Sequence, residues 1–169
     1  MANSRKKILF IVNPISGTRG NISLENLLSQ HLDDELFDWE VYFTKGRTDA
    51  TLKAKDAVYK GVDIVAAVGG DGTINEVAQG IVGTDAFMAI IPNGSGNGFA
   101  NYFNISHDPA QAIKKINKLK SKTIDTGRFN GQLFLTVAGL GFDAQVAHAF
   151  DQLALEVLYL MSGFPGGSF

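Results

Sequence analysis

The strongest restriction on the fold is the alternation of short apolar runs with helix-like segments over residues 8–120. The first run, residues 8–12, contains only apolar residues, which is typical of a strand buried on both faces of a parallel sheet. Further strands are predicted at residues 39–43, 63–68 and 87–91. Strands that alternate with helices pair in parallel and carry helices on both faces. The sequence therefore predicts an α/β fold of three layers with a parallel sheet in the middle.

Four predicted helix starts carry residues that cap helices. Ser23 and Thr48 each offer a hydroxyl oxygen, and residues 73–76 (Thr-Ile-Asn-Glu) match the S/T-x-x-E capping box. Asp108 followed by Pro109 shows the favoured order of cap and first helical residue. The helix that starts there is expected to direct three apolar side chains inward: Ile113, Ile116 and Leu119.

The pattern changes after residue 122. Residues 123–128 and 132–138 are predicted to be strands, joined by a turn at Asn130-Gly131, a pair that favours tight hairpins. Residues 143–161 are predicted to be helical. This hairpin departs from the alternation of strands and helices that precedes it.

Composition excludes several classes of protein. Hydrophobic residues make up 45% of the chain, and 15 Lys and Arg against 17 Asp and Glu give a net charge of −2, which excludes a disordered tail. The same balance argues against a nucleic-acid-binding protein, which needs a positive field. The absence of Cys excludes a disulfide framework, a thiolate zinc site and a catalytic thiol. The N-terminal apolar run is too short for a signal peptide, so a cytoplasmic protein is expected.

Three polar, glycine-containing loops follow the first, third and fourth predicted strands. They span residues 13–17, 69–73 and 93–98, and we call them the first, second and third loop. Ligands of open α/β sheets bind beyond the carboxyl ends of the strands. Because all three loops fall there, we expect them to form one site.

The second and third loops have the composition of an anion-binding site. Glycines let the backbone turn tightly and bring its N–H groups close to a bulky anion, and a helix N-terminus adds partial positive charge. Asp71 is unusual in this setting, because its charge repels phosphate. It fits if a divalent cation stands between the carboxylate and the phosphate, or if Asp71 takes a proton from an attacking hydroxyl. Ser95 offers a hydroxyl and a backbone N–H to a phosphate oxygen.

Other signatures in the chain carry less weight. No G-x-x-x-x-G-K-[ST] segment is present, so the chain is not a P-loop enzyme. Residues 139–144 match G-x-G-x-x-A, but they follow a hairpin, and no strand with a ribose-binding acid comes about 20 residues later. We interpret that match as chance. His31, His107 and His148 lack metal-ligand spacing, and we assign them no role in the site.

Taken together, the motifs resemble those of the diacylglycerol kinase catalytic domain family, which includes bacterial lipid kinases and the sphingosine and ceramide kinases. The resemblance covers residues 5–150. Its Gly-Gly-Asp-Gly-Thr segment alone is less specific, because NAD kinases and phosphofructokinases share it. Residues 92–100 are similar to the second motif of the lipid kinases, and residues 125–128 and 139–144 to the lead into their second domain. The series that carries the resemblance is Asn13-Pro14-x-Ser16-Gly17, Gly69-Gly70-Asp71-Gly72-Thr73 and Pro92-x-Gly94-Ser95-x-Asn97.

The resemblance implies ATP-dependent phosphorylation of a lipid hydroxyl, of diacylglycerol or sphingoid type, with Mg²⁺. It implies a nucleotide-binding domain of the NAD kinase/diacylglycerol kinase-like type that acts on lipid at a membrane surface. Asp71 is expected to act as the general base or to help organise the metal, whose ligands stay unassigned. The residues expected at the nucleotide are Asn13, Pro14, Ser16, Gly17, Thr44, Gly69, Gly70, Asp71, Gly72, Thr73, Ile74, Asn75, Glu76, Gly94, Ser95 and Asn97.

Members of this family are typically much longer and have a β-rich second domain. The resemblance therefore implies an ATP-binding domain at residues 1–122 and the start of an incomplete second domain at residues 123–169. The exposed edges of an incomplete domain predict self-association, so a homo-oligomer is expected. Two alternatives remain open: a NAD kinase-like enzyme, whose acceptor is a soluble dinucleotide, and a catalytically silent nucleotide-binding module.

Overall fold

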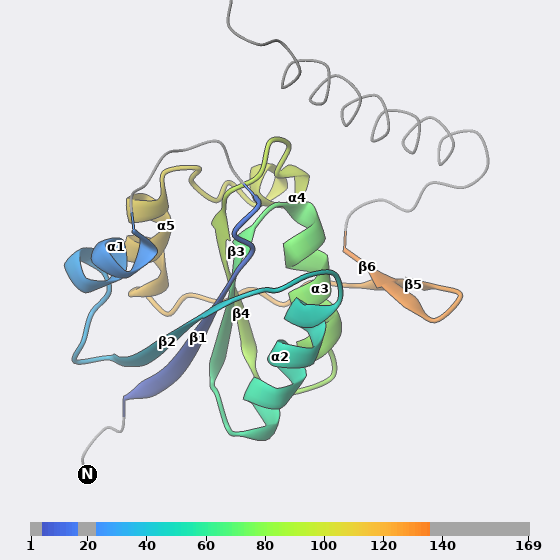
Figure 1. The fold of residues 1–169 in the computed structure, drawn as a ribbon, viewed down its shortest axis with the longest axis horizontal. Helices are drawn as coiled ribbons and strands as arrows, with labels where there is room; N and C mark the ends of the chain where they lie inside the picture. The colour runs from blue at the N-terminus through green and yellow to red at the C-terminus, as the bar shows by residue number, and fades with distance from the viewer. Residues whose placement is uncertain (1–4, 17–22, 136–169) are drawn as a thin grey trace, which may run out of the picture. The chain divides into compact units, whose positions relative to one another are not determined.

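The computed structural model describes residues 5–16 and 23–135 of the chain, and its centre is a parallel sheet (Figure 1). The sheet has four strands in the order β2-β1-β3-β4, and every neighbouring pair is parallel. All four predicted strands are confirmed. Their bounds are β1 (Lys6–Val12), β2 (Phe37–Phe43), β3 (Ile64–Gly69) and β4 (Phe87–Pro92).

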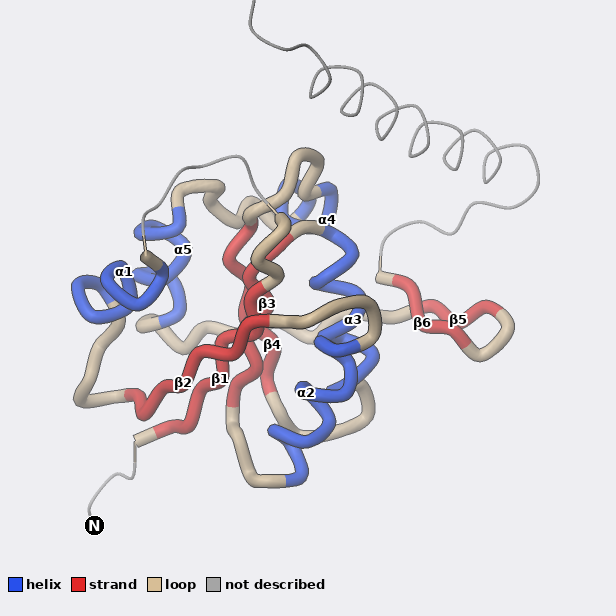
Figure 2. The backbone as a smooth tube through the Cα atoms, in the orientation of Figure 1, coloured by secondary structure: helices blue, strands red, loops and turns tan. Residues whose placement is uncertain are grey.

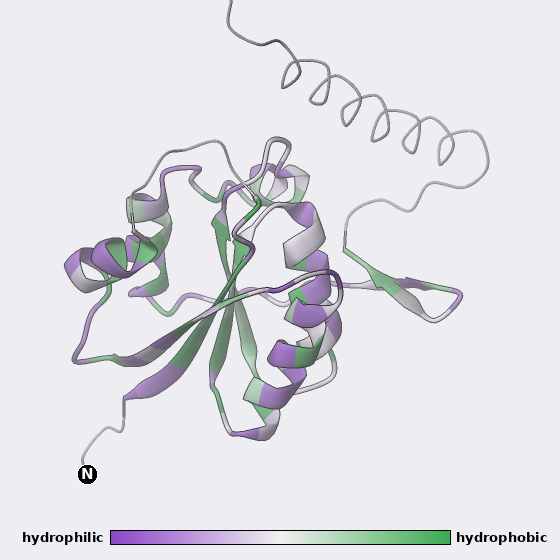
Figure 3. Ribbon diagram, viewed as in Figure 1, coloured by the Kyte–Doolittle hydropathy of each residue, from purple (hydrophilic) through white to green (hydrophobic). Residues whose placement is uncertain are grey.

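Helices cover both faces of the sheet, which confirms the three-layer prediction (Figure 1). One face carries α1 (Leu24–His31) and α5 (Pro109–Ile116), and the other carries α2 (Asp49–Tyr59) and α3 (Asp71–Ile81). A short helix that the sequence did not predict, α4 (Gly98–Tyr102), follows β4. Figure 3 shows hydrophobic strands between helices with hydrophilic surfaces. No helix in the described part of the chain is long and apolar enough to cross a membrane.

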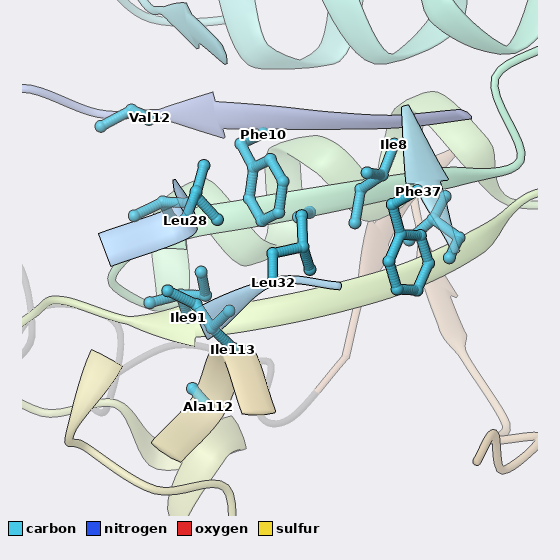
Figure 4. Packing of buried hydrophobic residues seen from close by; sticks show 12 residues of the cluster. Ile8, Phe10, Val12, Leu28, Leu32, Phe37, Ile91, Ala112 and Ile113 are labelled. Carbon is cyan, nitrogen blue, oxygen red and sulfur yellow. The ribbon is translucent and has the colours of Figure 1, made fainter. Parts of the chain in front are cut away.

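The side chains of β1 alternate between two hydrophobic cores. Phe10 points to one face, where it packs with Leu28 of α1 and Ile113 of α5 (Figure 4). Leu9 and Ile11 point to the other face and pack with α2 and α3. Successive residues of a strand face opposite sides of the sheet. Because both sides of β1 are covered, every residue from 8 to 12 is apolar and buried.

Helices α2 and α3 meet at Gly80, where there is no room for a side chain. A Cβ at Gly80 would lie 2.5 Å from the Cβ of Ala54 and 2.8 Å from the carbonyl oxygen of Thr51. Gly80→Ala is therefore expected to lower the free energy of unfolding by about 1–3 kcal/mol, although the helix propensity of Ala offsets part of this loss. A urea titration measures the effect. Gly46→Ala is the control, because a Cβ there meets nothing within 4 Å, and equal losses in both variants would contradict the prediction.

The side-chain caps follow the prediction for one helix and differ for two others. Asp108 caps α5 as predicted, and its Oδ1 accepts a backbone N–H of the first turn at 3.0 Å. Ser23 precedes α1, but its hydroxyl donates to the carboxylate of Glu25 at 2.6 Å, and this bond holds the pKa of Glu25 below its ordinary value. The hydroxyl of Thr48 donates to the carbonyl oxygen of Arg47 at 2.6 Å instead of capping α2. Neither hydroxyl oxygen accepts a backbone N–H of its helix.

The predicted capping box at residues 73–76 is wrong. Helix α3 begins earlier, at Asp71, with Gly70 at the N-cap position. The threonine of the motif is therefore buried inside the first turn. Glu76, which the capping box would turn back on its own helix, instead accepts the N–H of Thr48 at 3.1 Å.

The hairpin after residue 122 is shorter than predicted. Strands β5 (Gly127–Phe129) and β6 (Gln132–Phe134) are antiparallel, and both turn residues, 130 and 131, have positive φ. Residues 123–126 form no strand, because the pairing with β6 starts at Gly127. The end of the second predicted strand and the predicted helix at residues 143–161 lie outside the described residues.

Helix α5 ends at Ile116, so the prediction that Leu119 faces the core is wrong. Asn117 follows the helix, and its side chain donates to the carbonyl oxygen of His31 at 2.8 Å and accepts the N–H of Asp33 at 3.2 Å. These bonds tie the end of α5 to the end of α1. The chain turns away from the helical path there, and Leu119 is 44% exposed.

Candidate functional site

The loops that follow the four strands lie at one edge of the sheet (Figure 2). The chain passes from β2 across β1 to reach β3, so the direction of winding reverses between β1 and β3. Ligands of open α/β sheets bind at such a switch point. The first loop follows β1 and the second loop follows β3, so the two loops flank it. The structure therefore brings the three loops to one edge, as the sequence predicts.

The first loop is hydrogen-bonded to the end of β3 and to the third loop. The N–H of Asn13 donates to the carbonyl oxygen of Val68, at the end of β3, at 3.0 Å. Its Oδ1 accepts the N–H of Ile15 at 3.1 Å. The side-chain amide of Asn93, in the third loop, donates to the carbonyl oxygen of Ser16 at 2.8 Å. The first and third loops are thereby joined across the end of β3.

Gly70 and Gly94 bring the second and third loops into contact through their backbones. A Cβ at Gly94 would lie 2.6 Å from the Cα of Gly70 and 2.9 Å from Oδ1 of Asn97. Neither glycine has a positive φ. The requirement for glycine at position 94 therefore comes from this close approach and not from an unusual backbone conformation.

Asp71 is the first residue of α3, and its carboxylate also holds the start of α4. Oδ2 accepts the N–H of Gly98 at 2.8 Å, and Oδ1 accepts the N–H of Phe99 at 3.0 Å. The partial positive charge of a helix N-terminus favours a carboxylate in this position. Asp71 is exposed, so the remaining lone pairs of its oxygens are open to a ligand. The sequence places Asp71 at the site but does not predict that it holds α4.

A series of hydrogen bonds, which we call the circuit, runs through the side chains of Asn97, His107 and Asn101 and starts and ends in the third loop. Asn97 is 2% exposed; its Oδ1 accepts the N–H of Gly94 at 3.0 Å and its Nδ2 donates to the carbonyl oxygen of Gly94 at 2.6 Å. The same Nδ2 lies 3.3 Å from Nδ1 of His107, and Nε2 of His107 lies 2.6 Å from Oδ1 of Asn101. The amide of Asn101 donates to the carbonyl oxygen of Gly96 at 3.1 Å. Sequence reasoning missed His107, because its spacing from Asn97 matches no motif.

The first turns of α3 divide between the core and the site. Thr73 and Ile74 are buried, and Ile74 belongs to the core under α2 and α3. Glu76 bonds the backbone of Thr48, as described above. Asn75 has a buried Oδ1 with no hydrogen-bond partner in the described part of the chain. A buried polar atom without a partner is unfavourable, so the amide oxygen of Asn75 is a second acceptor of α3 available to a ligand, besides the carboxylate of Asp71.

The other predicted site residues lie as follows. Thr44 follows β2 at the same edge of the sheet, and its N–H donates to the carbonyl oxygen of Val12 at 2.8 Å. Pro14 and Ser95 are exposed in the first and third loops. Gly17 lies outside the described residues.

Comparison with known proteins places the chain in a family. The family model named "Diacylglycerol kinase catalytic domain" matches residues 7–129, a range that holds all three loops. The chain belongs to the diacylglycerol kinase catalytic domain family. The resemblance that the motifs of the three loops indicate is thus confirmed.

Individual relatives are about one-third identical to this chain in sequence. A diacylglycerol kinase of Staphylococcus aureus (strain Newman) is 32% identical over 173 residues, which cover 95% of this chain and 53% of that protein. An uncharacterized protein of Synechocystis is 32% identical over 154 residues, which cover 84% of this chain and 35% of that protein. The crystal structure of a diacylglycerol kinase from Bacillus anthracis matches with a TM-score of 0.65 at 32% identity and covers 77% of this chain and 48% of that one. The chain thus spans about half, or less, of the length of these relatives.

This member of the diacylglycerol kinase family has the donor set of a phosphate site. Backbone N–H groups lie at the N-terminus of α3, and no side chain separates the two loops at Gly70 and Gly94. The described loops contain one carboxylate, Asp71, and Mg²⁺ is commonly held by one or two carboxylates together with substrate phosphates. No group of three His, Cys, Asp or Glu within the described residues is arranged to hold a metal. The residues therefore fit a cation that binds together with a phosphate.

Proposed function

We propose that this chain forms the ATP-binding part of a lipid kinase, which transfers the γ-phosphoryl group of ATP to a hydroxyl of a diacylglycerol or sphingoid lipid. The observation that carries the proposal is the backbone contact of Gly70 with Gly94 beside the N-terminus of α3. It gathers the backbone N–H groups of two loops and the positive end of a helix at one place, which suits a polyphosphate. Membership of the diacylglycerol kinase family supports the lipid acceptor.

The proposal assigns the loops to different parts of ATP. Asn13 and Ser16 of the first loop contact the nucleoside end of ATP, and so does Thr44, which follows β2. All three lie on the β1 side of the switch point. The second loop and Ser95 bind the phosphates, because backbone N–H groups and a hydroxyl are good donors to anionic oxygens. Asn75 accepts a hydrogen bond from the ligand through its unpaired Oδ1.

Asp71 is the charged group of the proposed reaction. A bound Mg²⁺ supplies charge neutralisation to the phosphates. Asp71 holds that ion, or accepts the proton of the attacking lipid hydroxyl, with the lone pairs that α4 leaves open. Phosphoryl transfer depends mainly on positioning and charge neutralisation, so the anchoring of this carboxylate by two backbone N–H groups is suited to either task.

We also assign two domains to the chain, with the boundary after residue 122. Residues 1–122 are assigned to the ATP-binding domain, since the layers of sheet and helix end with α5. Residues 123–169 are assigned to the start of a second domain, since β5 and β6 begin an antiparallel pattern. A lipid acceptor implies that the enzyme works at a membrane surface.

ATP with Mg²⁺ is expected to raise the melting temperature of the 169-residue chain until the site is saturated. A ligand that binds only the native state stabilises it by about 2.7 kcal/mol at 100 times its dissociation constant. The measurement is a series of thermal melts at increasing ATP concentration, with adenosine as the control because it lacks the phosphates. A cooperative melt that ATP does not shift would show that these loops do not bind ATP.

The acceptor is tested separately with labelled ATP and three acceptors in parallel: diacylglycerol, a sphingoid base and NAD. Phosphorylated lipid without phosphorylated NAD supports the lipid kinase. Phosphorylated NAD alone supports the NAD kinase-like alternative. ATP binding without transfer to any acceptor supports the silent nucleotide-binding module.

A further inference from the structure

The backbone of Gly94 determines the direction of the Asn97 side-chain amide. Oδ1 of Asn97 accepts the N–H of Gly94, and Nδ2 donates to its carbonyl oxygen. The reverse orientation would set donor against donor and acceptor against acceptor. The atom that lies 3.3 Å from Nδ1 of His107 is therefore Nδ2, which can only donate. It follows that Nδ1 of His107 is an acceptor and carries no proton.

Asn101 determines the state of the other ring nitrogen in the same way. Its Nδ2 donates to the carbonyl oxygen of Gly96, so its Oδ1 is the atom that faces Nε2 of His107 at 2.6 Å. Oδ1 can only accept, and Nε2 must donate to it. His107 is thus the neutral imidazole with its proton on Nε2. In this form every donor of the circuit meets an acceptor, from Gly94 to Gly96.

We propose that neutral His107 is a positioning residue, which holds the third loop in the conformation that binds the phosphates of ATP. This inference rests on the proposed function. The circuit starts and ends in the third loop, at the glycine that contacts Gly70 and at Gly96. Protonation of His107 puts a hydrogen on Nδ1, opposite the hydrogens of Asn97 Nδ2. The buried amide of Asn97 then loses an acceptor, and the third loop loses a hydrogen bond that stabilises its conformation.

Three charged groups on the neighbouring elements are engaged with backbone atoms. Asp108, next to His107 in the chain, accepts a backbone N–H at the start of α5. Asp71 of α3 accepts the first N–H groups of α4. Lys115 of α5 donates to the carbonyl oxygen of Asn104 at 3.1 Å. Of the two ring nitrogens, Nδ1 faces the side-chain amide of Asn97 and Nε2 faces that of Asn101.

The test compares ATP affinity at about pH 8 and about pH 5.5, a range over which histidine changes charge. Wild type, His107→Asn and His31→Asn are titrated with ATP and Mg²⁺. Asparagine keeps an acceptor close to the place of Nδ1 but cannot be protonated there. Wild type and the His31 variant are expected to lose about 5- to 10-fold more affinity on acidification than His107→Asn. Protonation of ATP itself is the same in all three titrations and cancels.

Two outcomes overturn this inference alone. One is that wild type and His107→Asn bind ATP with the same dependence on pH. The other is a ¹⁵N spectrum of the wild-type imidazole at about pH 8 that shows the proton on Nδ1, whereas we expect it on Nε2. The spectrum needs no variant and no ligand, so it applies even if the variant misfolds. A wild-type chain that binds no ATP at about pH 8 overturns the proposed function, and the role of His107 with it.

Discussion

Asp71→Asn is expected to weaken the binding of ATP with Mg²⁺ by about 100-fold and to abolish phosphoryl transfer. The carboxylate accepts the N–H groups of Gly98 and Phe99 with one oxygen each. An asparagine side chain retains one acceptor and sets an NH₂ group against the other N–H. Hydrogen bonds to a charged acceptor are about twice as strong as neutral ones, so the start of α4 loses much of its anchor.

The same substitution also removes the carboxylate from the described loops. A cation that binds with the phosphates then has no anionic protein ligand there, and an attacking hydroxyl has no carboxylate to accept its proton. The effect on ATP binding should therefore depend on Mg²⁺, with a larger loss in its presence than in EDTA.

Asp85→Asn is the matched control for this prediction. Asp85 is an exposed aspartate in the turn after α3, at the other end of that helix, so its replacement removes the same charge far from the loops. Calorimetric titration of both variants with ATP and Mg²⁺ measures the difference. Equal affinities for the two variants would show that Asp71 has no special part in the site.

Gly94→Ala is expected to weaken ATP binding by about 10- to 100-fold and to lower the free energy of unfolding by about 1–3 kcal/mol. The added Cβ would lie 2.6 Å from the Cα of Gly70, a backbone atom that no side-chain rotation can move away. The two loops must separate by a substantial part of an ångström. Backbone N–H groups that are placed for one phosphate chain then no longer reach it together.

Gly96→Ala separates this steric effect from a general effect of stiffening the third loop. A Cβ at Gly96 would lie 3.8 Å from Oδ2 of Asp71, an ordinary contact distance. Both substitutions remove the same conformational freedom from the unfolded chain. Only Gly94→Ala should impair ATP binding in the titration. Similar losses in both variants would mean that the contact between the loops is not what shapes the site.

The strands of the sheet could be predicted from the sequence because burial on both faces produces a continuous apolar run. Residues 8–12 are covered on both faces, and such a strand has to be apolar at every position. The helix caps were harder to predict, because a capping hydroxyl oxygen must accept a backbone N–H of the first turn, and this depends on the backbone conformation at the cap. Thr48, for example, has a φ of 65° instead of the extended conformation that is usual at an N-cap. The hydroxyl of Ser23 donates to the carboxylate of Glu25, and the hydroxyl of Thr48 donates to the preceding carbonyl oxygen. The order of residue types along the chain is the same whether such a hydroxyl caps the helix or not.

For the candidate site, the positions of the loops could be predicted from the sequence, but the contacts between them could not. Its three loops could be placed because the end of a parallel strand is a topological position, known once the strands are known. The bonds of Asp71 to α4 and the circuit through His107 depend on distances between segments that are far apart in the chain. No periodicity or motif records those distances. Ile74 and Glu76 belong to the motif, but Ile74 packs in the core and Glu76 accepts the backbone N–H of Thr48.

The contact of Gly94 with Gly70 has a consequence for how this gene can change. Glycine is the smallest amino acid, so every missense mutation of codon 94 adds a Cβ, which would lie 2.6 Å from the Cα of Gly70. No conservative replacement exists for it, in contrast to Asp71 or Ser95. Codon 94 is therefore expected to accept synonymous mutations alone, and a variant library of this gene would show it as a position without any functional alternative.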